Sequence, residues 1–296
     1  DQFSSQNERY TKGLFAFALS NKSKLTAGAS VVSLTDSYFN TRNFTDAAEP
    51  DRTLFLGSTY LGTFDYNSLN RRQYANSGTQ FLASVRYTEG QERHNPGPTS
   101  EADFETRHAH NWWKLKLKVD SYYKSKGALR LGLYGEGVFS NMDLFENYAS
   151  SALRSPFFEP IPENCTFFLE SFRAYKFAAI GHKVIFNVFR NFDFRLEGYL
   201  FKPFEFADRV QDFDDLDADG LTSDLVQVSG FSNSLFGERY YTVATANAVY
   251  NSPLGPISLS LNYYLNSPEF STDVRPQPVT LFFHFGYILF NDRAVR

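Results

Sequence analysis

The acidic stretch DFDDLDADGLTSD, residues 212–224, has the spacing most typical of a chemical site. Alternate carboxylates followed by a glycine open a calcium-binding loop, because the carboxylates converge on a hard cation and the glycine permits a sharp turn. The matching residues are Asp215, Asp217, Asp219 and Gly220. Position twelve holds Val226 instead of glutamate, and Asp224 replaces it only if the loop closes early. We favour an acidic, solvated loop tip over a calcium site.

Histidines offer a second kind of chemistry, because a serine–histidine pair can hydrolyse esters. The chain has five histidines. His284 lies in an alternating stretch near the C-terminus, and His108 and His110 lie beside Trp112 and Trp113. Such a pair meets in space and not in sequence, so spacing does not identify one. We interpret these histidines as ordinary polar residues, and a membrane phospholipase with a Ser–His pair is the less favoured alternative.

The elements that carry these groups show strict alternation of apolar and polar residues. In GPISLSLNYYLN, residues 255–266, every second residue from Ile257 to Leu265 is apolar. Period-two alternation indicates a strand with one apolar face and one wet face. The pattern recurs in residues 80–88, 113–120, 129–139, 192–200 and 279–289.

The amino-acid composition limits the classes of protein in which these strands can occur. The chain has 296 residues with 32 Phe, 18 Tyr, one Cys and a net charge of -4. A mean hydropathy of -0.37 and the lack of any apolar run near the required ~18 residues argue against transmembrane helices. The mild charge argues against nucleic-acid binding, and one cysteine excludes an internal disulfide framework. The aromatic content fits a soluble β-sandwich or a transmembrane barrel with aromatic girdles.

Strand length favours the barrel. The alternating segments run for roughly ten to fifteen residues, whereas strands of soluble proteins usually have about five or six. A tilted strand that crosses a membrane needs about nine to eleven. The polar face also carries charges of both signs, as a barrel lumen does. The sequence therefore predicts an all-β fold, a transmembrane antiparallel β-barrel in the bacterial outer membrane, whose apolar face contacts lipid.

We expect about eleven strands, joined by alternately tight and long connectors as in outer-membrane barrels. Their ranges are 8–19, 23–35, 52–66, 77–90, 103–122, 127–141, 166–189, 192–204, 238–250, 255–266 and 278–290. Bacterial single-chain barrels have even strand numbers. We therefore expect further strands before Asp1, unless residues 166–189 form two strands and the count is twelve.

Charged residues on the predicted inner face have two interpretations. The cations are Lys114, Lys116, Lys118, Arg86, Arg130 and Arg195, and the acids are Glu136, Asp193 and Glu197. They either line a path for anions or pair across neighbouring strands and stiffen a narrow barrel. We favour pairing.

Several stretches resemble the surface-antigen barrel superfamily of bacterial outer membranes, to which BamA and TamA belong. FDYNSLNRRQYANSGTQFLASVRYTEGQE, residues 64–92, is similar to a descending strand, periplasmic turn and ascending strand of that superfamily. The residues that match its motif are Asn67, Leu69, Asn70, Arg71, Tyr74 and Gly78. Residues 251–266 resemble its Gly-Pro-Ile hairpin, and residues 282–290 resemble its final strand.

A closer resemblance is to the barrel of the patatin-like phospholipases of Bacteroidetes, carried by residues 147–177 and 194–203. It implies a 16-stranded barrel preceded by a patatin domain and a periplasmic POTRA domain. Residues 1–296 would then be the barrel domain without its first strands. The chain lacks the Gly-x-Ser-x-Gly nucleophile elbow of patatins, so hydrolysis would lie upstream. Residues 226–241 lack the superfamily's Arg-Gly pair, which argues against its assembly and secretion activities.

The resemblance thus implies an outer-membrane barrel that anchors or presents a lipid-hydrolysing domain, with no catalytic residue in this chain. One alternative is a pore or translocation platform without enzymatic activity. Another is a barrel subunit of a larger envelope complex. The expected partners are outer-membrane lipids, with other envelope proteins or a second copy of the chain as further candidates. We expect no nucleic acid and no cofactor apart from the calcium considered above.

Overall fold

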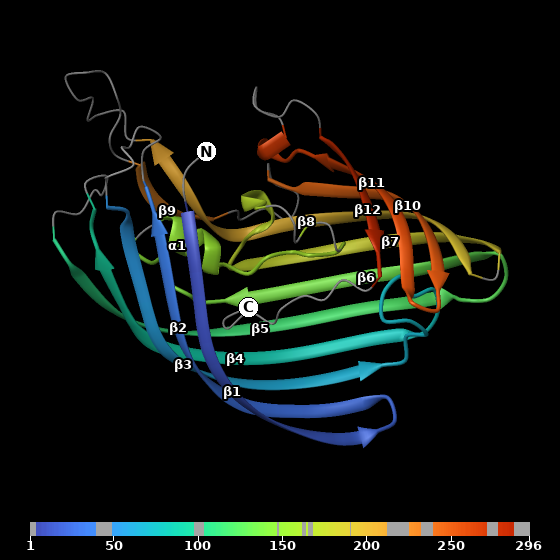
Figure 1. Ribbon diagram of the computed structural model, residues 1–296, viewed down its shortest axis with the longest axis horizontal. Coiled ribbons are helices and arrows are strands. Elements are labelled where there is room, and N and C mark those ends of the chain that lie inside the picture. The colour runs from blue at the N-terminus through green and yellow to red at the C-terminus, as the bar shows by residue number, and fades with distance from the viewer. Residues whose placement is uncertain are drawn as a thin grey trace.

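A single antiparallel sheet dominates the computed structural model (Figure 1). The structure describes residues 4–39, 49–97, 104–146, 148–161, 164, 168–189, 191–211, 225–231, 239–270 and 278–286. Within these residues, twelve strands belong to this sheet and the helices are short. The predicted all-β class is therefore confirmed.

The strands follow one another in space almost as they do in sequence. They are β1 (Ser4–Ser20), β2 (Ser23–Tyr38), β3 (Asp51–Asn67), β4 (Thr79–Asn95), β5 (Thr106–Lys124), β6 (Leu129–Ser140), β7 (Lys176–Phe189), β8 (Phe192–Gln211), β9 (Leu225–Phe231), β10 (Tyr241–Ser252), β11 (Gly255–Leu265) and β12 (Val279–Phe285). The helices are α1 (Tyr148–Arg154), η2 (Glu170–Phe172) and η3 (Pro268–Phe270). Antiparallel pairing runs from β1 through β8 to β10, β11 and β12.

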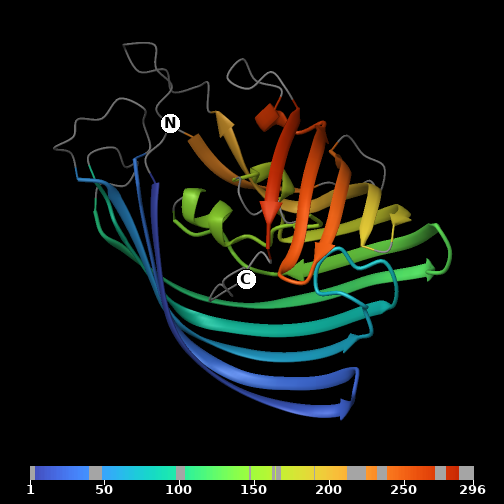
Figure 2. The same ribbon diagram turned by 45° about the vertical axis from the view of Figure 1, so that its right-hand side comes forward.

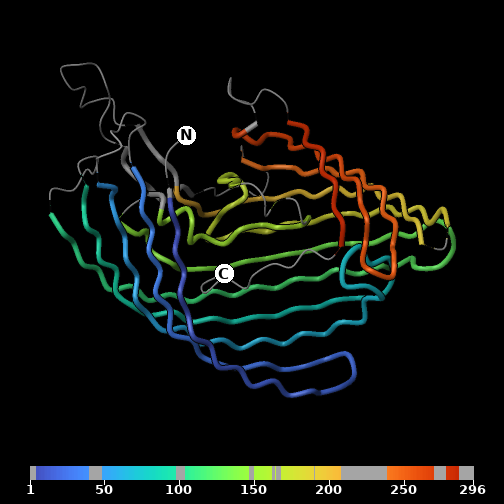
Figure 3. Tube along the Cα trace, viewed as in Figure 1, coloured from blue at the N-terminus to red at the C-terminus, as the bar shows by residue number. Residues whose placement is uncertain are grey.

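Each of the eleven expected strands has a counterpart, with two corrections. The strand expected at 166–189 begins only at Lys176, and η2 precedes it. Within the region expected to be a loop, 205–237, β8 continues to Gln211 and β9 pairs with that extension. The connectors β1–β2, β3–β4 and β5–β6 lie at the same end of the sheet, as Figure 3 shows.

The alternation in the sequence gives the sheet an apolar outer face and an inner face that carries its polar residues together with part of the hydrophobic core. In β11, Leu259 and Leu261 are each 48% exposed, whereas Ser260 and Asn262 are 0% exposed. The two tryptophans of β5 divide in the same way, since Trp113 is 51% exposed and Trp112 is 2% exposed. The sheet curves so that the inner face is concave (Figure 2). Large apolar side chains cover the outer face, which is unusual for a soluble protein.

The sheet is curved but open among the described residues, because no pairing joins β1 to β12. The described part of the chain also contains no helix long and apolar enough to cross a membrane.

The β3–β4 connector, residues 68–78, has a conformation that its own side chains fix. The side-chain oxygen of Asn67 accepts a hydrogen bond from the amide of Leu69 at 2.9 Å. That of Asn70 accepts from the amides of Asn76 and Ser77, both at 3.1 Å. Such Asx contacts favour turns.

Gly78 closes this connector with a φ of +95°, a value that other residues rarely adopt. A Cβ at this position would lie 2.1 Å from the carbonyl oxygen of Ser68. The close approach and the dihedral angle together explain why a glycine ends the Asn-x-Leu-Asn-Arg motif.

Candidate functional site on the concave face

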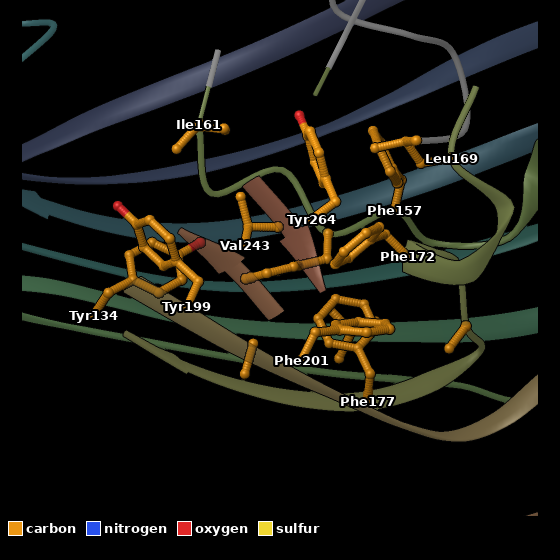
Figure 4. Close-up of a cluster of buried hydrophobic side chains, with 14 residues drawn as sticks. Tyr134, Phe157, Ile161, Leu169, Phe172, Phe177, Tyr199, Phe201, Val243 and Tyr264 are labelled. Carbon is orange, nitrogen blue, oxygen red and sulfur yellow. The ribbon is translucent and has the colours of Figure 1, made fainter. Parts of the chain in front are cut away.

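A long segment between β6 and β7 packs into the hollow of the sheet (Figure 2). We refer to residues 141–175, which include α1 and η2, as the inner segment. Its side chains pack with those of β6, β7, β8, β10 and β11 in one buried hydrophobic cluster (Figure 4). The cluster comprises Tyr134, Val138, Phe157, Phe158, Ile161, Leu169, Phe172, Ala174, Phe177, Ala179, Tyr199, Phe201, Val243 and Tyr264.

Aromatic stacking dominates this cluster. The ring of Phe158 stacks on that of Phe201 with centroids 5.2 Å apart. Phe172 meets Tyr264 edge to face at 6.2 Å, and the Tyr264 hydroxyl donates to the Asn164 side chain at 2.9 Å. Aromatic pairs of this kind contribute about 0.5–1.5 kcal/mol each beyond the burial of their area. The inner segment is thus packed as a core and does not merely cover the sheet.

A second hydrophobic cluster fixes the start of the inner segment. Phe145 packs against Phe55 of β3 and Trp112 of β5, with ring centroids 5.7 and 6.2 Å apart. It also stacks on the ring of His110 at 4.4 Å. Tyr175, in the same cluster, is 1% exposed, and burial raises the pKa of its hydroxyl.

Buried charges hold the inner segment to β2. The guanidinium of Arg154, the last residue of α1, contacts Asp36 Oδ2 at 2.5 Å, and both side chains are almost fully buried. The guanidinium also lies 4.7 Å from the centroid of the Phe145 ring. Because an isolated buried charge is costly, each member of the pair depends on the other.

Arg173, beyond η2, closes the inner segment on itself. Its guanidinium donates to the carbonyl oxygens of Ala152 and Leu153 at 3.3 and 3.1 Å. It also lies over the ring of Phe157 at 4.8 Å. One arginine therefore ties the end of the segment to the end of α1.

The β3–β4 connector crosses the other end of the concave face. Arg71 contacts Asp193 Oδ2 of β8 at 2.8 Å. Tyr74 and Ser258 of β11 share a hydroxyl hydrogen bond at 2.9 Å. Arg195 of β8 donates to the carbonyl oxygen of Ala75 at 2.9 Å. Two separate segments thus span the hollow, one from each end.

Several charged side chains of the inner face pair with one another, but among the pairs described here only Lys116–Glu136 joins neighbouring strands, as the favoured interpretation predicted. Lys116 contacts Glu136 at 2.7 Å, and Arg195 contacts Glu197 at 2.7 Å. Lys183, which the sequence analysis did not name, contacts Asp120 at 2.7 Å. The cation on Asp193 is Arg71 of the connector and not a strand residue.

The candidate histidines contact acids or aromatic rings. His110 contacts Glu92 at 2.6 Å in a buried position, and His108 contacts Glu146 at 2.9 Å. The ring of His284 stacks on Phe282 with centroids 5.9 Å apart. The His110 contact joins β5 to β4, the His108 contact joins β5 to the inner segment, and the His284 contact lies within β12.

The predicted calcium ligands Asp215, Asp217 and Asp219 lie outside the described residues. Among the residues that are described, no group of three or more His, Cys, Asp or Glu side chains is arranged to hold a metal ion. Calcium binding by residues 212–224 stays a prediction.

No protein-family model matches the chain, and a search of the curated proteins finds no match.

We predict that Arg154→Met strongly destabilises the inner segment, because it leaves the Asp36 carboxylate buried without its partner. Breaking a buried pair in this way costs about 3–5 kcal/mol. The measurements are urea unfolding of the detergent-solubilised chain and limited proteolysis between α1 and η2.

Arg93→Met is the matched control, because Arg93 contacts Glu105 at 2.7 Å with 47% of its side chain exposed. Exposed pairs contribute about 0–1 kcal/mol. The double variant Asp36→Leu/Arg154→Met should recover much of the loss. Equal losses for Arg154→Met and Arg93→Met would contradict the prediction.

Proposed function

We propose that the chain forms part of the wall of an outer-membrane β-barrel that anchors or presents a patatin-like lipid-hydrolysing domain. The observation that carries this proposal is the apolar outer face of the sheet. Leu117, Leu281 and Phe283 are 56%, 66% and 70% exposed on the outer face, and neighbouring outward positions are similarly apolar. Soluble monomers rarely expose contiguous apolar surface beyond a few hundred Å².

Lipid contact accounts for this surface, because acyl chains are as apolar as the side chains that meet them. Pairing between strands also satisfies the backbone hydrogen-bonding groups that lipid cannot satisfy. At the same time the polar side chains lie on the concave face, where they pair with one another. Each of these features supports a membrane setting over a soluble one.

The filled concave face favours an anchor over an open pore. The inner segment packs a hydrophobic cluster across the hollow, and the β3–β4 connector bridges its other end. A wide conducting channel needs a wet lumen. In the proposed function, therefore, the chain holds its partner domain at the membrane and does not itself move solutes.

In this proposal the hydrolytic chemistry belongs to an upstream patatin domain. The sequence given has no Gly-x-Ser-x-Gly nucleophile elbow. The barrel's contribution is physical, since it fixes the enzyme beside its lipid substrate and raises the local concentration of each for the other.

Quenching of tryptophan fluorescence by brominated lipid tests the membrane setting. The chain has two tryptophans, Trp113 facing outward and Trp112 facing inward. In proteoliposomes, we expect strong quenching of Trp112→Phe, which retains Trp113. We expect weak quenching of Trp113→Phe, which retains Trp112. Equal quenching of the two variants would overturn the orientation of the outer face.

Single-channel recording in a planar bilayer separates the anchor from the pore. We expect little steady conductance from the native chain. Replacing residues 143–172 with a short Gly-Ser linker should increase it, because the inner segment no longer fills the hollow. The linker closes without strain, since the Ser140 amide donates to the Tyr175 carbonyl at 2.8 Å. A large, steady conductance from the native chain would favour the pore.

The intact mass of the protein purified from native membranes tests the anchoring role. We expect a mass well above 33.8 kDa, with the Ser–Asp dyad of a patatin in the additional sequence. A mass of 33.8 kDa would contradict the lipase anchor. A stable co-purifying partner at that mass would identify a subunit of an envelope complex.

A further inference from the structure

A cavity of about 310 Å³ lies on the concave face between the inner segment and the β3–β4 connector. Tyr74 and Ala75 of the connector line one end, and Pro160 and Ile161 of the inner segment line the other. Pockets for small molecules usually measure about 300–1,000 Å³. The cavity therefore has room for a small molecule, and both of its ends are built from packed segments.

Most charges around the cavity are paired. Lys183 contacts Asp120 at 2.7 Å, and Arg195 contacts Glu197 at 2.7 Å. Each of these pairs fixes the position of a charge and leaves little net field. The cavity lining also includes Arg72 and Glu159, one cation and one acid.

Of the described lining cations, Lys118 and the exposed Arg72 have no such carboxylate contact, and Lys118 is the more buried of the two. It lies on β5 and lines the cavity, yet within the described residues no carboxylate oxygen lies within 4.0 Å of its ammonium. Glu136, opposite it on β6, contacts Lys116 instead, at 2.7 Å. The Lys118 ammonium lies 5.5 Å from the centroid of the Tyr134 ring, within the range of a cation–π contact.

The remaining lining offers further groups for a ligand. Amide side chains of Gln80 and Asn247 face the same cavity, and Tyr122 and Ile161 supply apolar walls. The Tyr122 hydroxyl is held by Arg195 at 3.3 Å. A partly buried ammonium among fixed pairs, with amide groups and a ring nearby, has the chemistry to bind one negative group on a small body.

We propose that this cavity binds a small organic oxyanion, a carboxylate or a phosphate monoester, whose charged group contacts Lys118. The body of the ligand lies between Tyr122 and Ile161. This inference goes beyond the anchoring role and rests on the packing of the concave face. Loss of the lipase anchor or of lipid contact would leave it intact.

Calorimetric titration of the full chain in detergent micelles tests the site with three probes. Glycerol 3-phosphate and succinate carry the two candidate charged groups, and glycerol is the neutral control. We expect one charged probe to bind and glycerol not to bind. The charged probe that binds with the higher affinity identifies the ligand as a phosphate ester or a carboxylate.

Lys118→Gln should weaken binding at least about tenfold, because it removes a charge-assisted contact. Lys118→Arg keeps the charge and should retain most of the affinity. Lys114→Gln is the matched control, because Lys114 lies on the same face of β5 but does not line the cavity. Tryptophan fluorescence and the urea midpoint check that each variant folds.

Two results would overturn the proposal. One is the absence of binding heat from both charged probes up to about 10 mM, a concentration range that detects weak affinities. The other is an equal loss of affinity in Lys114→Gln and Lys118→Gln, which would indicate a diffuse positive lumen and not a built site.

Discussion

Backbone pairing between neighbouring strands is the constraint on which the rest of the structure depends. In β4 and β5 it runs without a break from the Thr79–Ser121 pair to the His94–Thr106 pair. An unbroken register keeps every second side chain on the same face, and a slip of one residue would exchange the faces. The apolar outer face therefore follows from hydrogen bonding along the whole sheet and not from any single contact.

The register also sends many strand charges to the concave side, where water is limited, although Arg93 and Arg107 near the strand ends stay exposed. Desolvated charges are stable only with partners. Some partners come from adjacent strands, as for Lys116 and Glu136. Others come from segments that fold inward, as for Asp36 and Asp193, which meet Arg154 and Arg71. The inward segments are thus part of the electrostatic balance of the sheet as well as of its packing.

The sequence predicted the strands well because alternation and turn preferences depend only on residues that are close together in the chain. The motif around Asn70 and Gly78 is readable for the same reason. The contacts across the hollow were not predicted, since Asp36 and Arg154 are 118 positions apart and no local pattern links them. Arg71 had a signal in its motif, but Arg154 and Arg173 had none. β9 was missed because a polar stretch of 205–237 resembles a loop.

The hydrogen bond between Tyr74 and Ser258 has a consequence for the order of folding. A chain of hairpins gains its neighbouring contacts early, because each closes a short loop. Tyr74 lies 184 positions from its partner, so we expect this bond to form late, after β4 to β8, β10 and β11 have joined the sheet. On this order of events, the β3–β4 connector stabilises the curvature of the sheet only after seven further strands have paired.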